Sequence, residues 1–297
     1  MDQTVTPGRQ PQIIASGAFD ANTSGAVVYW TMAGLVDAGV LEMMWDEAGL
    51  DARLLATGAS PATALKRAMK EYADSRTGES VRPIYLQDGE EGEEGYVVVK
   101  ETYDGKGRPT YTNVLEVKLV AGEPAIPDGA DDEAEVAVRQ EFRRNLGRLN
   151  ASDMGTWLVR LLGGVKALRL RESGGFYFVP REYVATWGAY VAAIQQAAPR
   201  ARLYSFPALR CDEAVAGILD ALKAEADELC EDFSVELEAG KLTERKAKGR
   251  RKSVKEMHEK LKLYEGILGQ SLTGIRADLD DIEARLVAEV LSAEDGL

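Results

Sequence analysis

The clearest structural signal in the chain lies at residues 253–291, with the sequence SVKEMHEKLKLYEGILGQSLTGIRADLDDIEARLVAEVL. Apolar residues recur there in steps of three and four, as on one face of a helix. One extra step of four, from Leu268 to Leu272, is typical of a stutter in a coiled coil. Ser253 and Glu256 fit a capping box at the start. The pattern predicts one helix of about 60 Å.

A second apolar stripe precedes this one, over residues 212–239, and a basic connection joins the two. We therefore expect an antiparallel coiled-coil hairpin over 208–297. The first helix is long enough to cover only about two thirds of the second. The remaining apolar positions then require another subunit, a partner protein or the body of the same chain. These expected interface residues are Leu268, Leu272, Ile275, Leu279, Ile282 and Leu286.

Residues 24–207 predict an α+β body, preceded by a loose arm over residues 1–23. Strand-like runs between 81 and 120 predict a small antiparallel meander. The other elements that we expect are helices at 25–37, 61–72, 131–148, 152–162 and 181–197, and a hairpin of 165–171 with 176–180. The last helix, hairpin and helix match a winged-helix fragment as well as an ordinary α+β unit, and we favour the second.

Composition narrows the classes of function. The chain has 297 residues and a net charge of −13, which argues against general binding to nucleic acid or to an anionic membrane. No apolar run approaches the roughly 20 residues that span a bilayer. The start of the chain has no apolar segment typical of a secretory signal. We therefore expect a cytoplasmic protein without a membrane partner.

The residues for common metal and cofactor sites are scarce. The chain has two cysteines, Cys211 and Cys230, and one histidine, His258. A zinc site built from these types usually needs four ligands, so we expect no such metal site. Phosphate-binding glycine motifs are also missing, and we expect no cofactor. His258 follows a core position of the predicted coil and should face solvent.

Glu116-Val117-Lys118 is the strongest catalytic candidate. Alternation on a strand places Glu116 and Lys118 on one face, and an upstream acid, Asp104, completes a pattern used by metal-dependent nucleases. The competing interpretation is an exposed, salt-bridging face of the meander. Because Asp104 falls in the preceding turn, we expect it to lie about 10 Å or more from Glu116, and we expect no cleavage of nucleic acid.

The stretch KLTERKAKGRRKSVK, residues 241–255, is a basic segment in an acidic protein. It suits phosphate groups, an acidic partner protein or the acidic loops of the chain itself. It contains no aromatic residue that could stack on bases. The candidate binding residues are Lys246, Lys248, Arg250, Arg251 and Lys252. Aromatic residues between Phe176 and Tyr190 form a separate cluster, which we interpret as core or, alternatively, as a docking patch.

The segments ALKRAM (64–69), GGFYFVP (174–180) and YEGILG (264–269) occur in this order. In this respect the chain resembles an uncharacterised family of bacterial and phage proteins of about this length. Some members are encoded beside MoxR-type AAA+ ATPases, so the resemblance implies an ATPase-linked partner. It transfers no catalytic residues.

These observations favour a non-enzymatic protein-interaction or assembly protein, which self-associates or binds another protein. The alternative is a nucleic-acid-binding protein, including a metal-dependent nuclease that uses Glu116 and Lys118.

Overall fold

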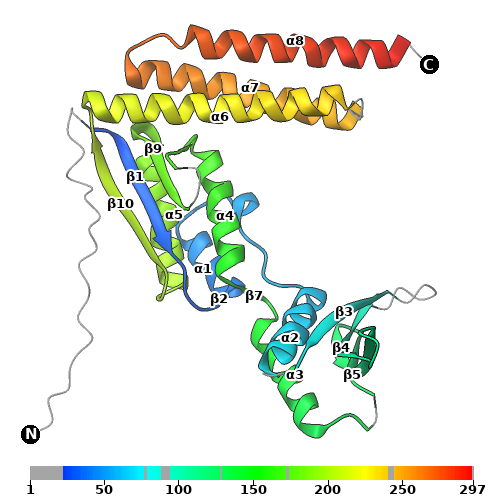
Figure 1. Ribbon diagram of the computed structural model, residues 1–297. Coiled ribbons are helices and arrows are strands. Elements are labelled where there is room, and N and C mark those ends of the chain that lie inside the picture. Colours follow the sequence, from blue (N-terminus) through cyan, green and yellow to red (C-terminus); the bar gives the residue numbers. More distant parts are fainter. Residues whose placement is uncertain are drawn as a thin grey trace, which may run out of the picture. The chain divides into compact units, whose positions relative to one another are not determined.

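The computed structural model describes residues 23–76, 79–87, 94–127, 129–171, 174–239 and 244–295. It is a mixed α/β protein with small antiparallel sheets, in two compact units (Figure 1). The first unit combines the described residues up to Thr31 with Val159–Val191 and those from Arg202 onward. The second unit comprises Met32–Leu158 and Ala192–Ala201. The predicted division at residue 207 stays a prediction, and nearly all of the predicted arm lies outside the described residues.

The first unit contains an antiparallel sheet with the strand order β10-β1-β9-β8. Its strands are β1 (Thr23–Thr31), β8 (Leu168–Arg169), β9 (Phe176–Pro180) and β10 (Arg202–Leu209). The predicted helix at 25–37 is wrong, because β1 occupies most of it and short β2 (Val36–Asp37) its end. Valine and aromatic residues favour strands. The strands also approach so closely that a Cβ on Gly25 would lie 2.2 Å from the Val179 carbonyl oxygen.

Three helices, not two, complete this unit: α6 (Asp212–Glu238), α7 (Glu244–Leu268) and α8 (Thr273–Asp295). Figure 1 shows them lying side by side and running in alternating directions. The single long helix predicted at 253–291 is therefore wrong. Gly269 ends α7 with a φ of 70°, a conformation that glycine adopts readily. Glu265 then accepts a hydrogen bond from the Leu272 amide and pairs with Arg276. The apparent stutter is a turn.

This turn changes what covers the apolar stripe. Leu268, Leu272, Leu279, Ile282 and Leu286 are all buried in one apolar cluster with residues of α6 and α7, and Ile275 packs against it. The stripe is covered within the chain, so its length no longer argues for a second subunit.

Two buried polar side chains of α7 join the helices to the segment after α4 (Ala151–Gly164). The Lys260 ammonium donates to the Ala167 carbonyl at 2.7 Å and pairs with Glu225 of α6 at 2.6 Å. The Tyr264 hydroxyl donates to the Lys166 carbonyl at 3.1 Å. Burial lowers the pKa of Lys260 and raises that of Tyr264. Because both polar groups have partners, their burial fixes the position of the bundle on this segment.

The second unit is built around the sheet β3-β4-β5-β6, and the predicted meander is confirmed. Its strands are β3 (Val81–Gln87), β4 (Glu94–Tyr103), β5 (Pro109–Val120) and β6 (Glu123–Ala125). Helices α2 (Pro61–Ser75) and α3 (Asp132–Asn145) pack against it and share its apolar core. Ser60 caps α2 as predicted. The remaining elements are α1 (Ala38–Glu47), η1 (Ala52–Leu54) and β7 (Arg148–Leu149), with η2 (Arg181–Tyr183) and α5 (Val184–Ala197) later in the chain.

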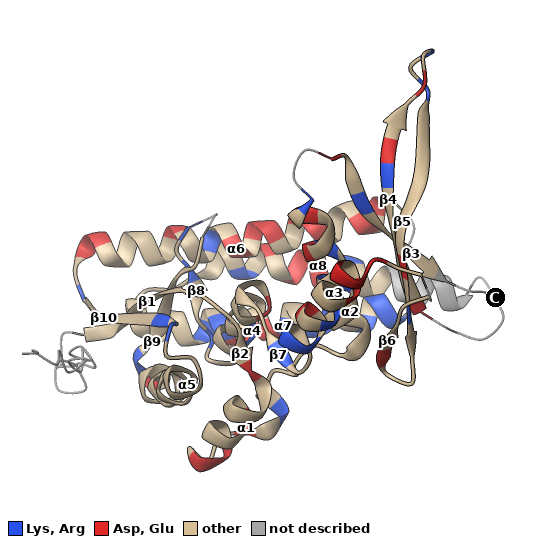
Figure 2. Ribbon diagram, turned by 90° about the horizontal axis from the view of Figure 1, so that it is seen from below, with Lys and Arg blue, Asp and Glu red and all other residues tan. Residues whose placement is uncertain are grey.

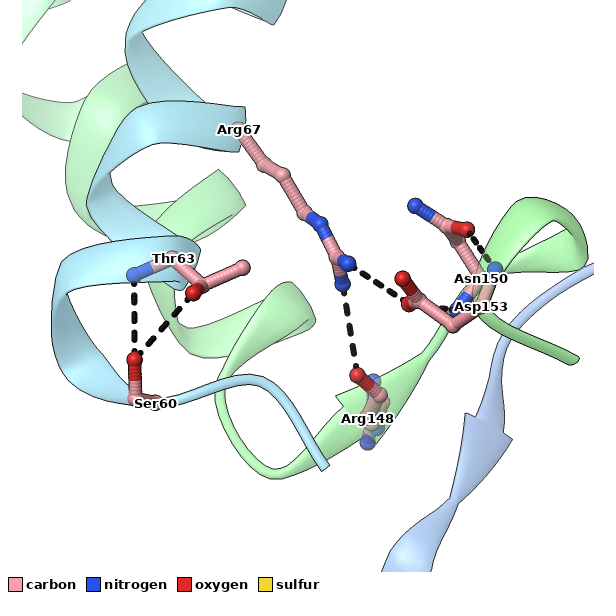
Figure 3. Close-up of polar contacts among 6 residues, drawn as sticks. All are labelled: Ser60, Thr63, Arg67, Arg148, Asn150 and Asp153. Atoms are coloured by element: carbon pink, nitrogen blue, oxygen red, sulfur yellow. Dashed lines mark hydrogen bonds and ion pairs between the residues drawn. The ribbon is translucent and has the colours of Figure 1, made fainter. Parts of the chain in front are cut away.

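A polar network fixes α2 within the second unit (Figure 3). Arg67 donates to the Arg148 carbonyl and forms a 2.6 Å ion pair with Asp153. Asp153 in turn accepts from the Asn150 amide, while the Asn150 side chain accepts from the Asp153 amide. This reciprocal cap starts α4. Arg67 therefore fixes α2 against the start of α4. Lys66 and Lys70 of the same helix are exposed at the surface.

Candidate binding surfaces

An exposed aromatic surface covers part of one face of the sheet in the first unit. It consists of Tyr29 on β1, Phe176 on β9, and Tyr204 and Phe206 on β10; we call it the aromatic face. The pairing of β1 with β9 and β10 brings these rings together, because Tyr29 lies opposite both Phe176 and Tyr204. Side chains two apart on a strand share a face, which adds Phe206. The alternate residues Ala26 and Val28 of β1 are fully buried.

The four rings form one contiguous group. The Tyr29 ring stacks on Tyr204 at a centroid distance of 4.7 Å and lies 5.9 Å from Phe206 and 6.2 Å from Phe176. Phe176, Tyr204 and Phe206 remain 41%, 39% and 44% exposed. Contiguous exposed apolar surface of this kind marks interaction sites more often than isolated apolar residues do.

Among the described residues, the α6, α7 and α8 cluster covers one end of this sheet face. Phe178 is buried in the cluster formed with α6, α7 and α8, and Ala208 packs against that cluster. Beyond them, the rings of the aromatic face remain partly exposed in the described part of the chain. In the described part of the chain, β10 pairs with β1 on one side and with no strand on the other. The aromatic face therefore reaches β10, the outer strand of the described sheet.

Sequence reasoning identified only one member of the aromatic face. Within the predicted cluster Phe176 is exposed, whereas Tyr177, Phe178, Trp187 and Tyr190 are buried, so the core interpretation holds for most of it. Tyr29 lay in a segment predicted to be helical, and 202–209 received no prediction. The alternating pattern of YSF at 204–206 was the signal available.

A second surface lies between α2 and the edge strand β3 in the second unit. It is an open groove of about 490 Å³ lined by Lys66, Lys70, Pro83, Tyr85 and Tyr96. The two tyrosine rings lie 5.3 Å apart and are tilted by 58°. Among the described residues, no carboxylate forms an ion pair with either lysine. The groove combines positive charge with aromatic rings.

The nuclease constellation is not assembled. Glu116 lies opposite Val97 in the register, whereas Asp104 follows the end of β4, where Tyr103 lies opposite Pro109. Seven residues along a strand correspond to about 23 Å, so Asp104 and Glu116 cannot share an ion. Figure 2 shows the β4–β5 hairpin extending past β3. Asp104 accepts hydrogen bonds from the amides of Lys106 and Arg108, which explains it as a turn residue.

The basic candidates lie on the first turns of α7, beside an acidic α6 (Figure 2). Arg250 forms a bidentate ion pair with Glu236 and lies over the Phe233 ring. The hydrogen bonds from Arg250 lower the pKa of the Glu236 carboxyl, and the positive charge of Lys246 lowers it further. Lys252 pairs with Glu256 at 3.7 Å. Lys248 and Arg251 are exposed. Arg250, at the centre of the basic stretch, is therefore already bound to residues of α6 in the same chain.

One comparison with known proteins gives a match. Residues 25–295 match the family of unknown function DUF6744. The chain belongs to this family. The resemblance to an uncharacterised family is confirmed at this level. No curated protein and no solved structure matches. None of the described helices is both long enough and apolar enough to span a bilayer.

Proposed function

We propose that this DUF6744 protein is a non-enzymatic assembly protein that self-associates through the aromatic face and the adjoining edge of β10. The observation that supports this proposal is the group of stacked, exposed rings that extends to β10, the outer strand of the described sheet. The helical stripe is buried within the chain, so we expect assembly through the aromatic face instead.

The edge of β10 suits a second copy of the same strand. Its sequence, RLYSFPAL, carries one charge, Arg202, at its first residue. Antiparallel pairing about a twofold axis near Ser205 would place the two Arg202 side chains at opposite ends. Like charges would therefore not oppose one another. Pro207 removes one backbone donor, so the rings must contribute much of the affinity.

The exposed area sets the expected strength. A whole aromatic side chain buries about 150–250 Å², so three rings exposed by about two fifths offer roughly 240 Å² per copy. Covering this area in both copies contributes about 12 kcal/mol at about 25 cal/mol per Å². Association costs about 4–15 kcal/mol. Even at the lowest association cost the net gain is about 8 kcal/mol, so we expect a reversible dimer with a dissociation constant no tighter than about micromolar.

Light scattering and sedimentation across a concentration series test the proposal. The full chain should shift from monomer to dimer, and the double variant Tyr204→Ser with Phe206→Ser should remain monomeric. Tyr103→Ser with Tyr111→Ser is the matched control, because these tyrosines are 66% and 49% exposed on the β4–β5 hairpin. A full chain that stays monomeric throughout, or a control that dissociates equally, overturns the proposal.

We propose nucleic-acid binding as the second candidate function, located at the groove between α2 and β3. The supporting observation is that Lys66 and Lys70 lie beside Tyr85 and Tyr96, since lysines contact phosphates and aromatic rings stack on bases. Filter binding with single-stranded DNA should show retention at low salt that Lys66→Ala with Lys70→Ala removes. Retention that is absent in the parent chain, or equal in this variant, excludes the groove. We expect no Mg²⁺-dependent cleavage.

A further inference from the structure

The only histidine of the chain lies beside two carboxylates of a neighbouring helix. The His258 Nε2 atom of α7 is 3.4 Å from Asp280 Oδ1 and 4.0 Å from Glu283 Oε2 of α8. Ligand atoms of all three side chains lie within 4.8 Å of one another. Sequence reasoning assigned His258 to a solvent-facing position and expected no metal site.

The helices bring these residues together for simple reasons. Asp280 and Glu283 are three residues apart, so they share one face of α8. His258 follows the buried core residue Met257 and sits at the margin of the α7–α8 contact. The imidazole is 23% exposed, whereas the carboxylates are 64% and 39% exposed. The arrangement is a partly buried nitrogen with two carboxylates open to solvent.

The distances suit one divalent ion. An ion bound at about 2.1 Å holds neighbouring ligand atoms about 3.0–3.6 Å apart. The separation of 3.4 Å from Asp280 lies within this range, and rotation of the Glu283 carboxylate would shorten the separation of 4.0 Å. One imidazole and two carboxylates suit zinc and similar first-row ions, and three protein ligands leave positions for water.

We infer that His258, Asp280 and Glu283 bind a divalent transition-metal ion that joins α7 to α8. The two helices are also linked by the turn after Gly269, by the ion pair of Glu265 with Arg276 and by apolar packing. An ion between them stabilises the folded state by binding it preferentially. Lys255 and Lys262, one turn before and after His258 on the same helix, oppose a cation, so the affinity is moderate.

Binding of Co²⁺ and Zn²⁺ to the chelator-treated full chain tests the inference. The expected result is one equivalent, with a Co²⁺ visible spectrum that Zn²⁺ removes and a higher midpoint of thermal unfolding with either ion. His258→Gln should lower the affinity at least about tenfold, since even changes to groups around the ligands cost about 10–100-fold. Asp280→Asn should also weaken binding. Asp281→Asn is the matched control, with the same charge change one residue along α8.

Three outcomes overturn the inference: no saturable binding by the parent chain, retention of full affinity in His258→Gln, or equal losses in Asp280→Asn and Asp281→Asn. The last result would assign the ion to the general acidity of α8. Without metal, His258→Gln and the parent chain should unfold at similar temperatures, which separates loss of the ion from loss of the fold.

Discussion

Truncation of one buried leucine in α8 distinguishes an internal core from an interface between subunits. Leu279 has no exposed surface and belongs to the apolar cluster of α6, α7 and α8. Leu279→Ala removes three buried side-chain carbons. At about 0.8 kcal/mol each, the lost burial lowers the free energy of unfolding by about 2.4 kcal/mol. The cavity left behind raises the loss to about 3–4 kcal/mol.

Urea unfolding followed by circular dichroism measures this loss. Val235→Ala is the matched control, because Val235 lies on α6 of the same bundle but is 60% exposed. The control should change the free energy of unfolding by no more than about 0.5 kcal/mol. Light scattering at low temperature should give the same mass for Leu279→Ala and for the parent chain.

Two results would refute the assignment of Leu279 to an internal core. A loss below about 1 kcal/mol would mean that the leucine is not enclosed by its own chain. A folded Leu279→Ala variant with a smaller mass than the parent would mean that the helical stripe joins subunits, as the sequence suggested.

Three further predictions concern polar groups and close backbone contacts. The raised pKa of Tyr264 means that the unfolded chain loses this proton first, above pH 10 or so, so stability falls as pH rises; Tyr264→Phe should reduce that fall in alkaline unfolding titrations. Gly58→Ala should unfold at a lower temperature in a thermal scan, because its Cβ would lie 2.3 Å from the Gly147 carbonyl oxygen. The ion pair of Arg67 and Asp153 is only 19% and 30% exposed, so Asp153→Asn should cost about 1–3 kcal/mol in urea unfolding.

Local signals predicted α2, α3 and the meander of the second unit well, but they did not predict α1. Ser60 and Pro61 start α2 where their capping chemistry places them, and the period-two runs at 81–120 form the meander. In these segments, local propensity and tertiary packing favour the same structure.

The errors arose where one pattern fits two structures. A stutter and a four-residue turn both add a step of four to an apolar stripe, and only Gly269 with its positive φ distinguishes them. The valines and aromatic residues of 25–31 have helical spacing, yet tertiary pairing with β9 and β10 makes them a strand.

The aromatic face was largely beyond the reach of sequence reasoning. Tyr29 and Tyr204 become neighbours only through the pairing of β1 with β10, and strand pairing over such a separation is not encoded in a local pattern. The contact of His258 with Asp280 required the turn between α7 and α8, which the predicted continuous helix excluded.

The position of β1 has a consequence for the order of folding. This strand leaves the ribosome first among the described elements, yet both of its neighbours, β9 and β10, are synthesised more than a hundred residues later. The backbone hydrogen bonds of β1 cannot form until β9 and β10 have been synthesised. By then almost the whole of the second unit is already available to fold. Closure of the sheet is thus a late, long-range step. A nascent chain held by a chaperone at this stage would present β1, including Tyr29, as an unpaired apolar strand.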